Sequence, residues 1–228
     1  LMVPKEEIDF HAKGKNILFS MDGKEISILV QGVIQSTGSS LGWWIQRILE
    51  TDDFAGETGQ DDLDHLGESS LIFYPHLTGD KTIYGDPNLR GAFWGIGTDT
   101  TRKEMTLAVM EGICLAARQL AEVMCLTREE LDGLKVTGGG SKNEVWMQML
   151  ADVLGVRVQQ LESGAGAGYG IALAAAGSRE EISMEQIIDH TVKIRKTFSP
   201  RPYNMGLYDK NIRKYKKMYQ CYQEMMKE

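Results

Sequence analysis

Cysteine and histidine are scarce in this sequence of 228 residues, and their scarcity excludes two classes of protein. The three cysteines, Cys114, Cys125 and Cys221, are few, odd in number and without metal-ligand spacing, which argues against a disulfide scaffold or a zinc site. We expect them to be reduced thiols, as in a cytoplasmic protein. The four histidines are scattered and contain no i, i+4 pair, so we predict no metal site.

Long apolar runs and a surplus of basic residues are also missing. No apolar run approaches the ~20 residues that span a bilayer, and no basic-then-apolar leader is present, so we predict neither membrane insertion nor secretion. The chain has 25 Lys and Arg against 32 Asp and Glu, a net charge of −7, which argues against nucleic-acid binding. Its 42% apolar and 25% charged residues are typical of a globular protein. Because the chain opens on Leu1 and not on methionine, we expect a longer parent protein.

Strand patterns followed by helix patterns recur along the chain and indicate one α/β domain over residues 1–228. A hairpin with an Asp-Gly turn is expected at residues 16–33, and a capping box of Thr101 and Glu104 starts a helix that ends near residue 124. An apolar helix is expected within residues 36–50, and the acidic segment 51–70 is expected to be exposed. The other expected strands are 71–74, 91–96, 134–136 and 156–161, and the other expected helices follow residue 143, span 164–176 and 183–192, and form the tail after residue 202.

Several polar residues have ordinary structural interpretations. We expect a solvated or capping role for Glu111, in the middle of a helix, and for Asp152, near a helix end. The last helix carries four tyrosines that cover either the core of the domain, which we favour, or a partner: Tyr208, Tyr215, Tyr219 and Tyr222. The lysines of this helix are expected to form its wet face. Asp80, Asp86 and Arg90 lie in a loop where they either touch a substrate or form an ordinary turn.

The first candidate site is the turn Gly138-Gly139-Gly140-Ser141-Lys142-Asn143, between a strand and a helix. Glycines allow positive φ and a close approach of the backbone to a ligand. Free N–H groups at the start of a helix suit a phosphate, and the amide of Asn143 suits a base or a ribose. A plain tight turn explains the glycines equally well, because neither the P-loop pattern nor G-x-G-x-x-G fits.

Two further glycine-rich segments carry weaker signals. Residues 37–42 (TGSSLG) either form another wall of a nucleotide cleft or only cap a helix. The glycines of residues 164–170 fit close packing of a helix on a sheet better than a phosphate loop. No nucleophile elbow is present, and no residue stands out as the base for phosphoryl transfer, so the catalytic residue stays unknown.

Taken together, these segments resemble the C-terminal domain of the FGGY-family carbohydrate kinases, closest to the xylulokinase-like branch. The matching stretches, in family order, are STGSSLGWW, SSLIFYPHLTGDKTIYGDPNLRGAFWGI, TRKEMTLAVMEGICLAARQLAEV, LKVTGGGSKNEVWMQMLADVLGVRVQQLESGAGAGYGIALAAAG and FSPRPYNMGLYDKNIRKYKKMYQ. The resemblance implies an actin-like ATPase (ribonuclease H-like) lobe with a mixed sheet flanked by helices. It also implies that the N-terminal lobe is absent and that residues 1–228 are truncated at their N-terminal edge.

The resemblance also implies a nucleotide-binding site for ATP or ADP. In it, Gly138 and Gly139, in one turn with Gly140, lie against the phosphates and the sugar, and Asn143 contacts the adenine end. The opposite wall of the adenine pocket consists of Gly38, Leu41 and Gly42. Relatives often carry a longer polar side chain where this sequence has Gly42.

The activity implied is transfer of the γ-phosphoryl group of MgATP to a hydroxyl of xylulose or a related ketose or polyol, in the cytoplasm. The catalytic aspartate, the aspartate associated with Mg²⁺ and most sugar contacts belong to the absent part, so we expect this chain alone to be inactive. A non-catalytic actin-like regulatory or interaction module is the alternative, and an oxidoreductase is a weaker one. The sequence leaves the oligomeric state open, a homodimer included.

Overall fold

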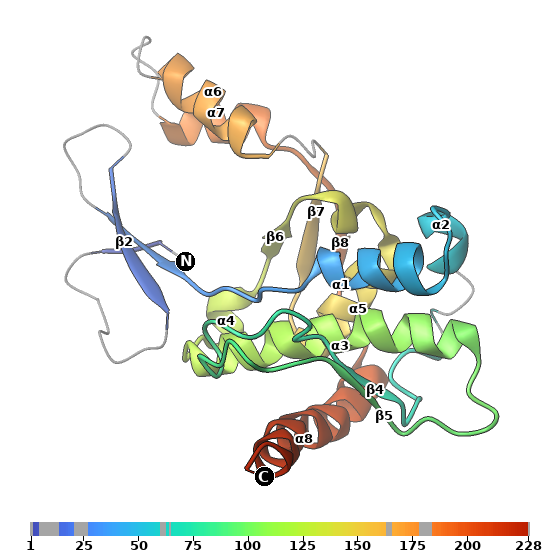
Figure 1. Ribbon diagram of the computed structural model, residues 1–228. Helices are drawn as coiled ribbons and strands as arrows, with labels where there is room; N and C mark the ends of the chain where they lie inside the picture. Colours follow the sequence, from blue (N-terminus) through green and yellow to red (C-terminus); the bar gives the residue numbers. More distant parts are fainter. Residues whose placement is uncertain are drawn as a thin grey trace.

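The computed structural model describes residues 2–4, 14–20, 27–59, 63, 65–162, 166–177 and 184–227, and Figure 1 shows their arrangement. The strands are β1 (Met2–Pro4), β2 (Lys15–Phe19), β3 (Ser27–Gln31), β4 (Ile72–Tyr74), β5 (Ala92–Trp94), β6 (Leu134–Val136), β7 (Val158–Leu161) and β8 (Ile194–Phe198). The helices are α1 (Gly38–Gly42), the π-helix η2 (Trp43–Ile48), α2 (Phe54–Glu57), α3 (Arg102–Val123), α4 (Arg128–Leu131), the 3₁₀ helix η4 (Gly139–Lys142), α5 (Glu144–Leu154), α6 (Ala167–Gly177), α7 (Met184–Thr191) and α8 (Pro202–Met225). No helix among the described residues is long and apolar enough to cross a bilayer.

A mixed sheet flanked by helices lies behind the glycine turn, as the predicted fold class requires. β6 runs parallel to β7, with Leu134 opposite Val158, and β8 pairs antiparallel to β7. The glycine turn and α5 connect the two parallel strands. One side of α5 packs against the sheet, and another side of α5 packs against α3. β8 was not expected, because only its last residue, Phe198, is buried and its sequence has no alternating pattern.

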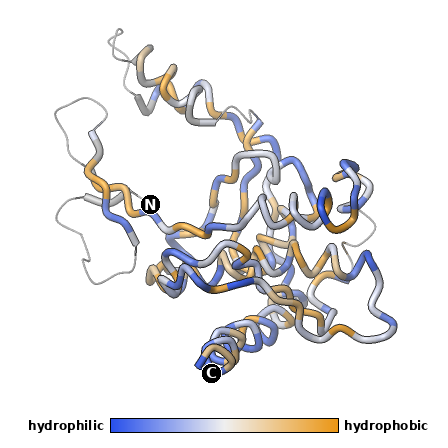
Figure 2. The backbone as a smooth tube through the Cα atoms, viewed as in Figure 1, coloured by the Kyte–Doolittle hydropathy of each residue, from blue (hydrophilic) through white to orange (hydrophobic). Residues whose placement is uncertain are grey.

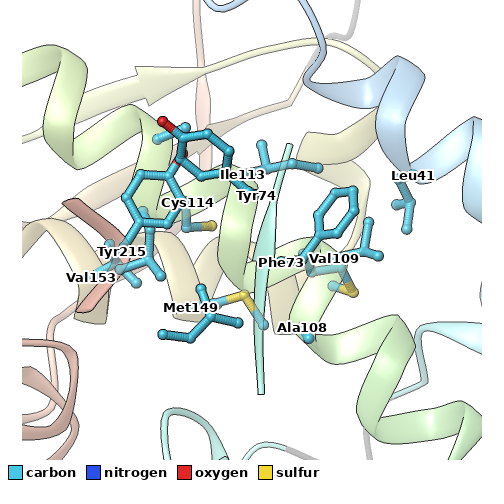
Figure 3. Close-up of a cluster of buried hydrophobic side chains, with 14 of the residues drawn as sticks. Leu41, Phe73, Tyr74, Ala108, Val109, Ile113, Cys114, Met149, Val153 and Tyr215 are labelled. Carbon is cyan, nitrogen blue, oxygen red and sulfur yellow. The ribbon is translucent and has the colours of Figure 1, made fainter. Parts of the chain in front are cut away.

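The main core lies between β4, α3, α5 and α8 (Figure 3). Phe73 and Tyr74 of β4 are buried against α3, and Tyr208 and Tyr215 of α8 are fully buried, as predicted for the tyrosines of the last helix. The backbones of α3 and β4 approach closely at Gly112. A Cβ built there would lie 2.2 Å from the carbonyl oxygen of Phe73, so only glycine allows this packing distance.

The predicted capping box of α3 is confirmed. The Thr101 hydroxyl accepts a hydrogen bond from the Glu104 N–H (3.2 Å), and the Glu104 carboxylate accepts one from the Thr101 N–H (2.7 Å). A second capping box, of Thr127 and Glu130, starts the short helix α4. The Ser183 cap predicted for the helix at 183–192 lies outside the described residues, whereas the helix itself is present as α7.

Two parts of the described chain stand away from this core (Figure 1). One is the antiparallel sheet β1-β3-β2, in which β2 and β3 are the strands of the predicted hairpin, while its Asp-Gly turn lies outside the described residues. The other is the pair α6 and α7. We expected α6 to pack closely on a sheet, and this is wrong: α6 contacts α7, and Ile171 is 70% exposed. Figure 2 shows apolar residues along α6. Because the sequence of α6 has no polar face, it does not indicate which side of the helix packs on the protein.

Two carboxylates expected to be solvated or capping are buried instead. Glu111 accepts hydrogen bonds from the Gly67 N–H and the Tyr208 hydroxyl, both at 2.8 Å. Burial raises the pKa of Glu111 to about 7, against the lowering effect of these two hydrogen bonds. Asp152 is fully buried and accepts two hydrogen bonds from the Arg201 guanidinium (2.7 and 3.0 Å). These contacts join α3 and α5 to the beginning of α8.

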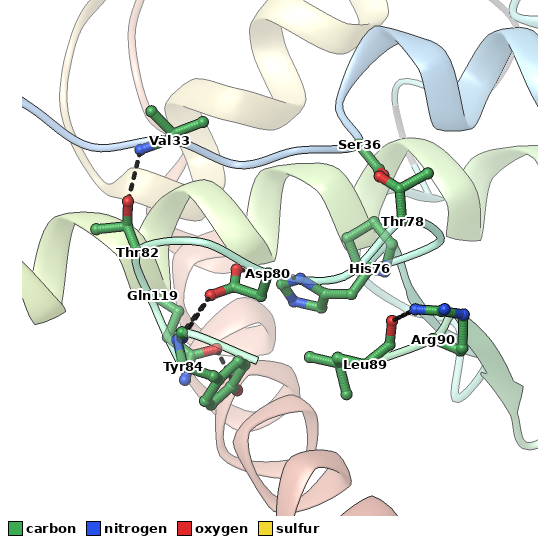
Figure 4. A network of polar contacts seen from close by, with 12 residues as sticks. Val33, Ser36, His76, Thr78, Asp80, Thr82, Tyr84, Leu89, Arg90 and Gln119 are labelled. Carbon is green, nitrogen blue, oxygen red and sulfur yellow. Dashed lines mark hydrogen bonds and ion pairs between the residues drawn. The ribbon is translucent and has the colours of Figure 1, made fainter. Parts of the chain in front are cut away.

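The loop between β4 and β5 is held by a buried polar network (Figure 4). His76 Nδ1 lies 3.3 Å from Asp80 Oδ1, and Asp80 Oδ2 accepts a hydrogen bond from the Tyr84 N–H at 2.7 Å. Burial opposes ionisation of Asp80, but the contact with His76 and the hydrogen bond from the Tyr84 N–H hold its pKa below the ordinary value. Asp86 accepts a hydrogen bond from the Asn88 N–H, and Arg90 donates to carbonyls of its own loop. In this structure all three polar residues singled out in the loop therefore stabilise the loop itself.

Candidate functional site

Two glycine-containing turns, about 100 residues apart in the sequence, meet at one cavity of about 540 Å³. Its lining residues are Gly38 and Leu41 of α1, Phe54, Ala55 and Thr58 in and after α2, and Gly139, Gly140, Lys142, Asn143 and Trp146 from η4 to α5. A cavity of this volume falls in the range of ~300–1,000 Å³ in which proteins bind small molecules. The fold therefore brings both predicted glycine turns to the same small-molecule-sized space.

A second cavity of about 390 Å³ shares several of these residues and reaches deeper, towards α3. Gly38, Gly139, Gly140 and Trp146 line both cavities, and Ile113 and Cys114 of α3 close the inner one. Burial raises the pKa of the Cys114 thiol, so this sulfur stays protonated and is no nucleophile.

Of the seven predicted site residues, six line these cavities. Gly38, Leu41, Gly139, Gly140 and Asn143 line the larger one, and Gly138 lines the inner one. Gly42 lines neither of them. A Cβ built at Gly42 has as its nearest neighbour the side chain of Gln46 on the following turn, at 3.9 Å. Gly42 lies one helical position past Leu41, on a different side of the helix.

The turn that begins at Gly138 has a fixed shape. Gly138 has a φ of +100°, a conformation that residues with a side chain rarely adopt. The Ser141 hydroxyl donates to the carbonyl oxygen of Gly138 (2.8 Å), and the Gln160 side chain donates to the carbonyl oxygen of Ser141 (2.5 Å). Among the described residues, none accepts a hydrogen bond from the N–H of Gly139 or Gly140. The turn thus presents two donors at the cavity wall.

The glycines of this site differ in what a side chain would meet. A Cβ built at Gly38 or at Gly139 has no atom within 4 Å, so both residues leave free space over the cavity. A Cβ at Gly140 would lie 2.7 Å from the Trp146 ring, so this glycine is needed for packing within the protein. The sequence alone does not separate these two uses of glycine.

The side chain of Asn143 holds the two walls of the larger cavity together. Its Oδ1 accepts a hydrogen bond from the Trp146 N–H (2.9 Å) and so caps α5. Its Nδ2 donates to the hydroxyl (2.6 Å) and the carbonyl oxygen (3.2 Å) of Thr58. The amide that we expected to face a base is thus engaged at both ends by the protein.

Sequence reasoning missed four of the ten lining residues of the larger cavity. They are Phe54, Ala55, Thr58 and Trp146, whereas Lys142 belongs to the predicted glycine turn. Phe54 is 37% exposed within an acidic segment, and this exposed aromatic residue among acids was the available signal. Trp146 belongs to an apolar helical stripe that equally predicts core packing.

Of the described residues that line the larger cavity, Lys142 alone is charged, and none is a carboxylate or a histidine. Among the described residues no group of His, Cys, Asp and Glu is arranged to hold a metal ion. This arrangement suits an anion with an apolar part, but it offers no acceptor for a hydroxyl proton.

The chain also matches proteins of a known family. The family described as "FGGY family of carbohydrate kinases, C-terminal domain" matches residues 19–178. A xylulose kinase of Bacillus subtilis is 30% identical over 216 residues, which are 94% of this chain and 43% of the relative. A glycerol kinase of Saccharolobus solfataricus is 28% identical over 202 residues, which are 82% of this chain and 39% of the relative.

Solved structures show the same likeness. The crystal structure of a xylulose kinase from Rhodospirillum rubrum superposes with a TM-score of 0.71 at 25% identity, and the superposition covers 89% of this chain and 41% of that one. The chain therefore spans about two-fifths of the length of the relatives that it matches.

Proposed function

Because this chain belongs to the FGGY family of carbohydrate kinases, we propose that it is the nucleotide-binding lobe of an ATP-dependent sugar kinase. The observation that carries the proposal is the meeting of two glycine turns at one cavity, with Gly38 on one wall and Gly139 on the other. Both glycines leave the space above their backbone free, as a backbone that lies against a ligand requires.

The residues present fit a nucleotide. The N–H groups of Gly139 and Gly140, which have no acceptor among the described residues, would donate to phosphate oxygens, and the Lys142 ammonium would attract their charge. Leu41, Phe54 and Trp146 provide apolar surface for a planar base. Asn143 has a positioning role in this proposal, because it joins the turn to Thr58 and keeps the cavity at its observed width.

The reaction that we propose is phosphoryl transfer to a hydroxyl of xylulose or a related ketose or polyol, in the cytoplasm. MgATP supplies the γ-phosphoryl group. Phosphoryl transfer depends mainly on positioning and charge stabilisation, and it needs a base for the hydroxyl proton. The described residues at this cavity contain no such base and no carboxylate for Mg²⁺, so both groups are assigned to the part of the kinase that this chain does not include. Alone, the chain is expected to bind nucleotide without turning it over.

Calorimetric titration of the chain with ADP, AMP, adenosine and NADH tests the nucleotide specificity. We expect ADP to bind more tightly than AMP or adenosine, because the unpaired donors of the glycine turn face its phosphates. The test depends on the ranking of the four ligands by affinity and not on any single dissociation constant. If NADH bound and ADP did not, the oxidoreductase alternative would replace the kinase.

A coupled assay of ADP production tests the assignment of the missing groups. With MgATP and xylulose, the purified chain is expected to give the same rate as a blank without protein. Sugar-dependent ADP production by the chain alone would show that the base lies within these residues and would contradict the assignment. The coding sequence upstream of Leu1 separates the remaining readings, because a kinase requires a catalytic aspartate there and a non-catalytic regulatory module does not.

A further inference from the structure

A separate cavity of about 630 Å³ lies between the β4–β5 hairpin and the C-terminal half of α8. It shares no lining residue with the two cavities at the glycine turn. In Figure 1 the C-terminal half of α8 lies on the side of α3 away from α1 and α2. Whatever this cavity binds is therefore a different molecule, or a different part of one, from the ligand of the candidate site.

The floor and sides of this cavity, which we call the α8 pocket, are apolar. Its apolar lining residues include Ile72, Ala92 and Trp94 of the hairpin and Met218, Tyr222, Met225 and Met226 from α8 and the residue that follows it. Trp94 is 62% exposed, and Met225 and Met226 are 67% and 63% exposed. Clustered exposure of large apolar side chains marks ligand or partner sites, and methionines adapt to ligands of irregular shape.

The charged lining of the α8 pocket has one sign. It consists of Arg90, Lys214 and Lys217, with no aspartate or glutamate, in a chain whose net charge is −7. Lys214 and Lys217 form no ion pair with any described residue, whereas their neighbour Lys216 pairs with Glu122. Three cations gathered without a counter-charge beside an apolar surface are complementary to an anion that carries an apolar body.

Two contacts fix the shape of this pocket. The Arg90 guanidinium donates to the carbonyl oxygens of Pro87 (3.0 Å) and Leu89 (2.8 Å), which holds it in place at the rim. The Tyr222 hydroxyl donates to the carbonyl oxygen of Asn88 (2.6 Å), which ties α8 to the loop before β5. The cation and the aromatic wall are therefore positioned before any ligand arrives.

We propose that the α8 pocket binds a small amphipathic organic anion, with an aromatic or long aliphatic body and a carboxylate, sulfonate or phosphate head. The body packs on Trp94 and the methionines, and the head lies among Arg90, Lys214 and Lys217. A volume of about 630 Å³ fits one molecule of this kind, in the range of ~300–1,000 Å³ usual for small-molecule sites.

Titration of the full chain with the aromatic sulfonate 8-anilino-1-naphthalenesulfonate, followed by dye fluorescence, tests this proposal. N-phenyl-1-naphthylamine, which has nearly the same rings and no charge, is the matched neutral probe. The variant Lys214→Glu/Lys217→Glu reverses the charge of the pocket. The control Lys210→Glu changes the charge of an exposed lysine on the same helix that does not line the pocket.

We expect saturable binding of the sulfonate by the parent chain and at least about tenfold weaker binding by the double variant, because two cationic contacts are lost. Lys210→Glu should bind the sulfonate like the parent chain. The neutral probe should bind the parent and the double variant alike, which shows that the variant keeps its apolar pocket. Near-ultraviolet circular dichroism of each variant checks that the dye reports a folded protein.

Three results would overturn the proposal. One is equal sulfonate affinity in the parent chain and the double variant. Another is an equal loss of affinity in Lys210→Glu, because the effect would then come from net charge alone. The third is a molar mass that doubles with protein concentration and falls back in the variant Trp94→Ala, because a second copy of the chain would then occupy the pocket.

Discussion

Glycine has opposite uses in two regions of this molecule. In the core, Gly112 of α3 lies against β4, and a Cβ there would meet the Phe73 carbonyl oxygen at 2.2 Å. At the candidate site, a Cβ on Gly38 or Gly139 would meet no atom within 4 Å. The absence of a side chain brings two parts of the protein together in the first region and leaves room for another molecule in the second.

This difference identifies which glycines the fold needs and which a ligand needs. A glycine kept for packing cannot gain a methyl group without loss of stability. A glycine kept for ligand contact can gain one with little effect on stability, but with a large effect on affinity. Single Gly→Ala substitutions therefore separate the two regions.

Gly112→Ala is expected to have the largest effect. The new methyl group would press on backbone atoms of β4, so α3 must move away from the strand and lose core contacts. We expect the free energy of unfolding to fall by about 3 kcal/mol, the upper part of the range for overpacking. Urea denaturation measures it. A loss below about 0.5 kcal/mol, the level of an ordinary surface substitution, would show that the α3–β4 contact is adjustable.

Glu111, the residue before Gly112 in α3, is expected to make the stability of the packed region depend on pH. The pKa of Glu111 is raised from 4.5 to about 7, so the folded protein holds a proton that the unfolded chain has lost. The stabilisation is complete below pH 4.5 and is lost as the pH rises through about 7. We expect this residue to lower the free energy of unfolding by about 2–3 kcal/mol over that range.

Glu111→Gln is the matched variant for this measurement. Its side-chain oxygen still accepts the hydrogen bonds from Gly67 and Tyr208, but it does not ionise. The fall in stability between about pH 5 and pH 8 should therefore be smaller in the variant than in the parent chain. Parallel pH profiles of the two proteins would mean that Glu111 is not desolvated.

Gly140→Ala is expected to have an intermediate effect, because its Cβ would meet the movable ring of Trp146 and not backbone. We expect a loss of about 1–2 kcal/mol in the free energy of unfolding. The fluorescence emission of Trp146, which lines the cavity, should also differ between the folded variant and the folded parent chain. Unaltered stability together with unaltered fluorescence would contradict the contact.

Gly206→Ala is expected to have a small effect on stability, of opposite sign. Gly206 lies in α8, where a Cβ meets no atom within 4 Å, as at Gly139. Because alanine has the higher helix propensity, we expect a gain of about 0.5–1 kcal/mol in the free energy of unfolding. Gly206 lies away from the candidate site, so this variant is also the control for substitutions at the site. A loss of stability here would show that open space around a glycine does not predict tolerance.

Local signals in the sequence predicted much of the fold. The capping box of Thr101 and Glu104 and the apolar stripe of α5 are short-range patterns, and both were confirmed. β8 was missed because its partner β7 is distant in the sequence, and α6 was assigned a sheet as its partner although it contacts the next helix, α7. A strand with one buried residue and a helix that is apolar on every side carry no periodic signal that shows where they pack.

The candidate site was predictable in part, for a similar reason. Both glycine turns were identified, because a glycine between a strand and a helix is a visible pattern. Asn143 donates a hydrogen bond to Thr58, which lies 85 residues earlier, and no sequence pattern predicts this contact. The same contact makes Asn143→Ala an ambiguous test of nucleotide binding, because the variant would lose the cap of α5 and the link to α2 together.

We assign the free space above Gly139 to a bound nucleotide in this proposal, and calorimetric titration of Gly139→Ala with ADP measures whether it is. We expect the free energy of unfolding of this variant in urea to equal that of the parent chain within about 0.5 kcal/mol, and its ADP binding to be at least about tenfold weaker. Gly206→Ala should bind ADP like the parent chain. Equal ADP affinity in Gly139→Ala and the parent chain would mean that no nucleotide lies over Gly139.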